Sequence, residues 1–152
     1  MDTTQSPITG ATLSQMTDAQ LDQLFGNSPV GPIPNGEAKG TAIIAPGTKI
    51  EPTIAKFVNV FAWQGKVFDA ASGELRNKIL PISLKAIVAK VYLDKSWYDG
   101  KDCVVLDYSQ TSLIAHWIRD EIRLVAPNTY LGLVYWGKNK LIHFALEFPA
   151  SN

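Results

Sequence analysis

Short runs of alternating apolar and polar residues recur along most of the chain and are separated by brief turn sequences. This pattern is typical of antiparallel strands. Asp99-Gly100 is the strongest hairpin signal among the turns. Eight strands in such a meander can close into a barrel, which removes exposed edges and leaves room for side chains or one small ligand. The pattern therefore predicts a mainly β protein, an antiparallel barrel of roughly eight strands, at residues 37–44, 63–69, 74–80, 84–98, 101–109, 112–125, 130–136 and 141–148.

Two segments have helical rather than alternating spacing. Residues 18–25 carry one apolar stripe and follow Thr17, which has capping-box spacing to Gln20, so they predict a short N-terminal helix. Residues 51–61 repeat apolar positions at helical intervals and predict a second helix. A single apolar stripe needs burial, so both helices should cover one opening or flank of the barrel.

The division of the chain follows from its polarity. Residues 1–11 are small and polar and are expected to be disordered. Residues 12–152 have the size of one domain and are expected to form a single β-barrel domain.

The charge balance excludes several classes of partner. The chain has 14 Lys and Arg against 14 Asp and Glu, so it lacks the basic excess that nucleic acids or anionic lipids attract. Its first residues lack the pattern of a signal peptide, and no apolar run is long enough to span a membrane. Cys103 is the single cysteine, which fits a reducing compartment. We therefore expect a cytoplasmic protein without a membrane span.

The sequence contains none of the common catalytic motifs that would indicate a reaction. The chain has no G-x-S-x-G, no P-loop and no G-x-G-x-x-G, and neither histidine has a partner at metal-ligand spacing. The sequence therefore predicts neither a metal site nor a cofactor.

The segment HWIRDEIRLV concentrates charge among apolar residues. Because side chains alternate along a strand, three interpretations stay open. In the first, one face packs inward and the charged face lies in water, where cross-strand ion pairs contribute a few tenths of a kcal/mol. The other two place a polar site on one face or the other. If the face of His116 and Asp120 lines the barrel, these two groups stand about 13 Å apart at ~3.4 Å per residue, and each needs a partner from another strand. If the opposite face lines it, arginine could hold a carboxylate or enolate oxygen bidentately. That opposite face carries Trp117, Arg119, Glu121 and Arg123.

The row of Arg119, Glu121 and Arg123 is expected to be partly enclosed, because an outward row would leave Trp117 in water. A buried row needs one further acid for charge balance, with Asp107, Glu147 and Glu74 as candidates.

Aromatic residues spread over nearly every strand suggest a binding wall. Such walls suit a flat or hydrophobic molecule, and they equally suit an ordinary barrel core. His143 shares a strand face with Glu147 among apolar neighbours. The expected ligand-binding residues are Trp63, Tyr108, Trp117, Arg123, Tyr135 and His143.

The predicted elements follow the order helix, strand, helix and meander. WQGKVF stands before the sheet, and DYSQTS, WIRDEIRLVAPNTYLGLVYW and FALEF come after it. Over about residues 30–149 this arrangement resembles small uncharacterised bacterial proteins of lipocalin-like (calycin-type) class. The resemblance implies a barrel that carries or binds apolar molecules, and a minority of such proteins catalyse isomerisation, cyclisation or lyase steps.

Two functions are therefore predicted as alternatives. The first is binding of a small hydrophobic molecule with a polar group inside the barrel. The second is a cofactor-independent isomerase, cyclase or dehydratase, in which Arg119 stabilises an oxyanion and Glu121, Asp120 or His116 moves the proton. A homodimer is a further alternative for the assembly of the chain.

Overall fold

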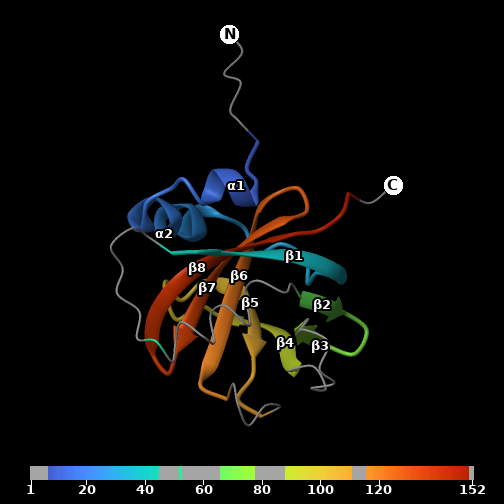
Figure 1. The fold of residues 1–152 in the computed structure, drawn as a ribbon. Coiled ribbons are helices and arrows are strands. Elements are labelled where there is room, and N and C mark those ends of the chain that lie inside the picture. The colour runs from blue at the N-terminus through green and yellow to red at the C-terminus, as the bar shows by residue number, and fades with distance from the viewer. Residues whose placement is uncertain (1–6, 45–51, 53–65, 78–87, 111–115, 151–152) are drawn as a thin grey trace.

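The computed structural model describes residues 7–44, 52, 66–77, 88–110 and 116–150. Its strands follow one another in antiparallel order, and the last strand returns to pair with the first (Figure 1). The predicted antiparallel eight-stranded barrel is confirmed. The strands are β1 (Gly36–Ile43), β2 (Lys66–Asp69), β3 (Glu74–Asn77), β4 (Val88–Lys95), β5 (Asp102–Asp107), β6 (Ile118–Ala126), β7 (Thr129–Trp136) and β8 (Asn139–Glu147).

The strand expected at residues 112–125 begins later than predicted. His116 and Trp117 lie in a turn before β6, and residues 111–115 are outside the described part of the chain. His116 is exposed and does not share the interior face of the strand, contrary to prediction. Alternation of apolar residues extended the prediction into the turn because it carries no information about where strand pairing stops.

The N-terminal helix is confirmed as α2 (Asp18–Asn27). Its capping box is present: Thr17 Oγ1 accepts from the Gln20 amide at 3.1 Å, and Gln20 Oε1 accepts from the Thr17 amide at 2.9 Å. The helix predicted near residues 51–61 lies outside the described residues, apart from Pro52, which is helical.

A further short helix, α1 (Gly10–Leu13), was not predicted. It begins inside the range 1–11 that was expected to be disordered, so that expectation is wrong for residues 10 and 11. The reason is local: Thr9 and Thr12 form a second capping box, and the Leu13 side chain is fully buried. The division at residue 12 into tail and single domain otherwise stays a prediction.

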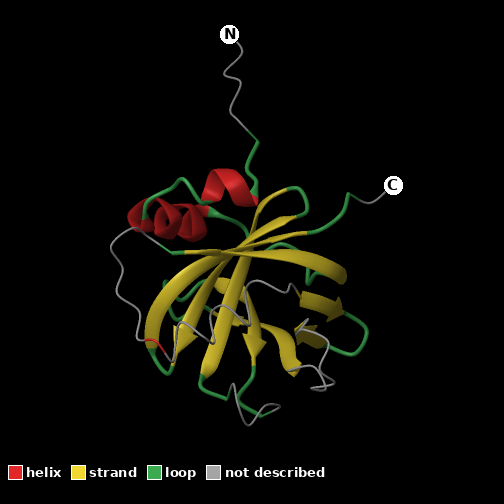
Figure 2. Ribbon diagram, viewed as in Figure 1, coloured by secondary structure: helices red, strands yellow, loops and turns green. Residues whose placement is uncertain are grey.

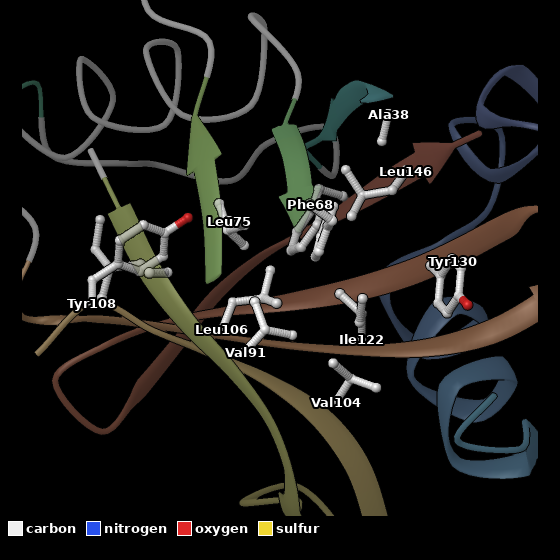
Figure 3. Packing of buried hydrophobic residues seen from close by; sticks show 13 residues of the cluster. Ala38, Phe68, Leu75, Val91, Val104, Leu106, Tyr108, Ile122, Tyr130 and Leu146 are labelled. Carbon is white, nitrogen blue, oxygen red and sulfur yellow. The ribbon is translucent and has the colours of Figure 1, made fainter. Parts of the chain in front are cut away.

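The barrel interior holds one apolar core, drawn in Figure 3. Tyr108 and Tyr130 lie at opposite ends of it. Residues 29–34 pack at the Tyr130 end, where the Tyr130 hydroxyl donates to the Pro32 carbonyl oxygen at 2.7 Å. The interior side chains are Ala38, Phe68, Leu75, Ala89, Val91, Val104, Leu106, Tyr108, Ile118, Ile122, Tyr130, Phe144 and Leu146.

A second core lies outside the barrel, between its outer face and the helices, which sit together on one flank (Figure 2). It joins Leu13, Leu21 and Phe25 to outward side chains of β5, β7 and β8. Both faces of these strands are therefore buried. Within the described residues there is no helix with the length and apolarity needed to cross a membrane.

Candidate functional site

The side chains on one face of β6 point into the barrel, and those on the other face point outward. Ile118, Asp120 and Ile122 are buried within the barrel. Arg119, Glu121 and Arg123 point outward, yet Glu121 is 0% and Arg123 1% exposed. The predicted enclosure of the charged row is thus observed on the outer side of the barrel, where other parts of the chain cover it. The alternative in which this row lines the interior is wrong.

Asp120 belongs to a small polar cluster in the interior, together with Lys66 and Tyr108. Lys66 Nζ lies 3.6 Å from Asp120 Oδ2 and donates to the Tyr108 hydroxyl at 3.0 Å. β2 and β6 begin here and β5 ends just before Tyr108, so all three residues lie at one end of the barrel. Residues 29–34 pack at the opposite end. We call these three residues the interior triad.

The interior triad is buried, and one acceptor atom of Asp120 lacks a partner. Lys66 and Asp120 are 2% and 3% exposed. Asp120 Oδ1 is buried without a hydrogen-bond partner. Burial raises the pKa of Asp120 to about 6, although Lys66 opposes this, and burial lowers the pKa of Lys66. The triad therefore places an acid that titrates near neutrality beside an amine that holds its proton weakly.

Aromatic rings surround the amine. Lys66 Nζ lies 5.6 Å from the centroid of the Tyr108 ring and 5.8 Å from that of Phe144. The face of the Phe144 ring can attract the cation, whereas Nζ meets Tyr108 at its hydroxyl end. The same rings form an apolar surface beside the polar groups.

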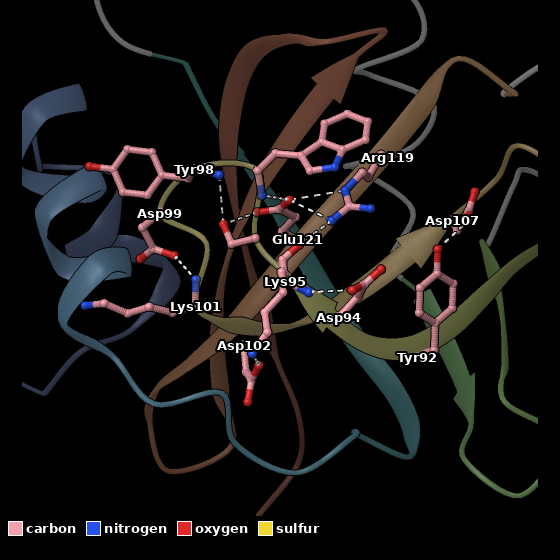
Figure 4. A network of polar contacts seen from close by, with 12 residues as sticks. Tyr92, Asp94, Lys95, Tyr98, Asp99, Lys101, Asp102, Asp107, Arg119 and Glu121 are labelled. Carbon is pink, nitrogen blue, oxygen red and sulfur yellow. Dashed lines mark hydrogen bonds and ion pairs between the residues drawn. The ribbon is translucent and has the colours of Figure 1, made fainter.

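Glu121 is the centre of a separate network on the outer face, shown in Figure 4. Its carboxylate accepts from Ser96 Oγ at 2.6 Å and from the Trp97 amide at 2.7 Å. Arg119 Nε and Nη2 both donate to Glu121 Oε2 at 3.1 Å, and the Arg119 guanidinium stacks 4.2 Å from the Trp97 ring centroid. Glu121 thus holds the turn between β4 and β5 against β6.

Arg123 connects that turn to α2. It donates bidentately to Asp99 at 2.6 and 2.7 Å and to the Phe25 carbonyl oxygen near the end of α2 at 3.0 Å. Hydrogen bonding from Arg123 lowers the pKa of Asp99 to about 2. The fourth charge of the buried row is therefore Asp99 from the turn, and not Asp107, Glu147 or Glu74 as expected from sequence.

His143 lies under α2 and not in the barrel. Its Nε2 is 2.7 Å from Asp22 Oδ1, and its Nδ1 is 3.1 Å from Asp18 Oδ1. Lys140 also pairs with Asp22. These contacts attach α2 to β8, which is a structural role.

The remaining predicted residues do not join the interior triad. Tyr135 faces outward, meets Trp97 edge to face at 5.3 Å, and lines a hollow of about 290 Å³ with Trp97 and Lys138. Trp117 is 57% exposed and contacts the ring of His116. The expectation that Trp117 would be covered is therefore wrong, although the row of Arg119, Glu121 and Arg123 beside it is enclosed. Trp63 lies outside the described residues.

Of the predicted residues, Asp120 and Tyr108 meet in the interior triad through Lys66. Arg119 and Glu121 bond to each other on the outer face instead. Sequence reasoning missed Lys66. The signal was the alternation in KVFD, which puts Lys66 on the same strand face as Phe68. Across the described residues, no three histidine, cysteine or acidic side chains converge in a way that could hold a metal ion.

Comparison with known proteins supports the fold alone. No family model matches the chain, and no curated protein matches it. A solved structure of a protein from Thermomonospora curvata is similar, with 16% sequence identity, 89% of each chain covered and a TM-score of 0.59. This similarity agrees with the barrel, and the lipocalin-like family itself stays a prediction.

Proposed function

We propose that this protein binds a small, mainly apolar molecule inside the barrel, with the polar group of that molecule against the interior triad. The observation that carries the proposal is the buried ion pair between Lys66 and Asp120. The second carboxylate oxygen of Asp120, Oδ1, lacks a hydrogen-bond partner. A buried ion pair is weak support for stability, since apolar residues of similar volume often serve as well or better. A buried acid with a raised pKa and an unpartnered oxygen, beside a lysine, is instead a candidate functional site.

The chemistry of the triad limits the polar group. Lys66 donates hydrogen bonds, while Asp120 Oδ1 accepts one when ionised. A hydroxyl or carbonyl oxygen on an apolar skeleton matches these groups, and the Phe144 and Tyr108 rings suit the skeleton.

Thermal shift against apolar alcohols, ketones and carboxylic acids tests the binding proposal. A ligand at 100 times its Kd stabilises the folded state by about 2.7 kcal/mol, so a clear rise in Tm is expected. The double variant Lys66→Met/Asp120→Asn should lose the rise, because it removes both charges and leaves neither unpaired. Tyr135→Phe, which alters only the outer hollow, is the matched control and should respond like wild type. The proposal fails if no compound raises Tm or if the double variant responds unchanged.

The second candidate function is proton transfer without a cofactor. It is favoured by the Asp120 pKa of about 6, which suits a general base at neutral pH, and by the Lys66 amine and Tyr108 hydroxyl beside it. Arg119 and Glu121, predicted as partners in this chemistry, lie on the other face of β6 and bond to each other. If the enzyme function holds, ketones found in the binding screen should exchange α-protons in D₂O about 10²–10⁴-fold more slowly with Asp120→Asn.

The proposal extends to location and assembly. The single thiol and the balanced charge support a cytoplasmic protein. A homodimer would cover Trp97 and Trp117, which are 49% and 57% exposed. Light scattering on the purified chain tests the dimer.

A further inference from the structure

Lys66 is a nucleophilic group in an unusual place. Among the lysines whose side chains the structure describes, it alone is buried. It lies at one end of the barrel interior, with the Tyr108 hydroxyl at 3.0 Å and a carboxylate oxygen of Asp120 at 3.6 Å. Its position on β2 directs it inward together with Phe68. A rigid strand therefore presents a primary amine to an apolar interior, next to two groups that can carry protons.

We propose that Lys66 Nζ forms a reversible Schiff base with a neutral, apolar aldehyde or ketone. The nitrogen lone pair attacks the carbonyl carbon to make a C–N bond, and the carbonyl oxygen gains a proton. The resulting carbinolamine then loses its C–O bond, and the nitrogen loses its remaining proton. The two protons that leave nitrogen depart with the oxygen as one water molecule. Nothing is oxidised or reduced, and hydrolysis reverses the reaction.

The neighbours of Lys66 match the proton transfers. Asp120 can accept the protons that leave nitrogen and return them to the oxygen of the carbinolamine, while Tyr108 holds Nζ at 3.0 Å and orients it. Burial also lowers the pKa of Lys66, which increases the share of free amine.

Charge selects the substrate class. The triad contains one basic and one acidic side chain, so a carboxylate on the ligand would add a second negative charge near Asp120. Lys66 is the single basic side chain of the triad and already pairs with Asp120, so burying a second negative charge beside it would be costly. The rings of Tyr108 and Phe144 near Nζ favour an apolar carbonyl compound.

This inference rests on the proposed function, since it needs a ligand inside the barrel. Pentane-2,4-dione is a suitable probe because its adduct with an amine is a stable enaminone that requires no reductant. Native protein at pH 7 is treated with the dione, and the modified lysines are identified by peptide mass mapping. Hydroxylamine, which reverses lysine adducts, separates them from arginine products.

The expected result is modification of Lys66 about tenfold or more faster than of Lys90, an exposed lysine on β4, because a positioned acid–base group such as Asp120 speeds proton transfer by about 10²–10⁴-fold. In urea the two lysines should react equally. Asp120→Asn should slow the reaction at Lys66, and Lys90→Met should not. The comparison of Lys66 with Lys90 is made in the wild-type protein, so it does not depend on whether a variant folds.

Reaction at Lys66 no faster than at Lys90 overturns the Schiff base. If apolar ketones still raise Tm in a manner that depends on Lys66 and Asp120, only the covalent step fails and the binding proposal stands. If no compound raises Tm either, both fail.

Discussion

Asp120 and Glu121 are neighbours in the chain with opposite surroundings. Both are buried, but Asp120 has one ion-pair partner in the barrel, while Glu121 accepts from a hydroxyl, a backbone amide and a guanidinium outside it. Direct hydrogen bonds to a carboxylate stabilise its charged form, whereas burial alone favours the neutral form. Two acids one residue apart therefore have different surroundings, and the proposed functions use Asp120 but not Glu121.

The raised pKa of Asp120 predicts a stability contribution that falls as pH rises. Between its ordinary value of 3.8 and its folded value of about 6, the native protein binds more protons than the unfolded chain. The contribution is complete below pH 3.8 and is lost as pH rises through 6. The stability advantage of wild type over Asp120→Asn should thus shrink between pH 4 and 6, by about 2–3 kcal/mol. Urea denaturation across this range measures it, and a constant or growing advantage would contradict it.

Glu121→Gln tests the outer network at the same scale. The substitution removes the charge of a fully buried carboxylate and leaves the half-buried Arg119 without its ion-pair partner, so the free energy of unfolding should fall by about 3–5 kcal/mol. The matched control is Lys95→Met, which breaks the exposed Lys95–Asp102 pair and should leave the urea midpoint almost unchanged. Equal midpoints for Glu121→Gln and wild type would mean that the network contributes nothing.

At the scale of elements, a glycine on a strand and a glycine on a helix differ in how closely a neighbouring side chain packs against them. Gly132 on β7 lies opposite Phe144 on β8, and a Cβ at Gly132 would stand 2.2 Å from the Phe144 ring. The Phe144 ring thus occupies the space that a side chain at position 132 would need. Gly26, near the end of α2, has only an ordinary contact of 3.6 Å with Tyr98.

Gly132→Ala should therefore destabilise the protein by about 1–3 kcal/mol through overpacking. Gly26→Ala, the matched control, should be neutral or stabilising by up to about 1 kcal/mol, because alanine favours the helix. Adding Phe144→Leu to Gly132→Ala should recover part of the loss if the ring is its cause. Urea denaturation of the three proteins decides this, and equal effects at the two glycines would disprove the assignment.

At the scale of the whole molecule, two cores share one wall of strands. Cys103 on β5 faces outward into the core beneath the helices, while its neighbour Val104 faces the barrel interior. Burial raises the pKa of the Cys103 thiol to about 12, so it reacts only when the outer core opens. The thiol is thus a reporter of how firmly α2 is held.

Phe25→Ala should increase the rate at which Cys103 reacts with a thiol reagent under native conditions, because it loosens the outer core directly. An interior variant of matched stability, such as Ile122→Ala, should increase it less, since the barrel wall separates the two cores. Rates that depend only on global stability, with no difference between the two variants, would show that the cores open together.

The sequence by itself determined the barrel, most strand positions and the capped helix α2. Alternation and turn residues act over a few positions, and the spacing of Thr17 and Gln20 is enough to start a helix. It also singled out Asp120 and Tyr108, and it indicated that the row of Arg119, Glu121 and Arg123 is enclosed.

Only the tertiary structure decided which face of β6 is interior and which partners each charge finds. Lys66 meets Tyr108 across 42 positions, and Arg123 meets the Phe25 carbonyl across 98. Such pairings depend on barrel closure and on where α2 packs, and alternation is unchanged when the two faces of a strand are exchanged. Because α2 and the turn at Asp99 cover the outer face, both faces of β6 are buried, and polarity could not distinguish them.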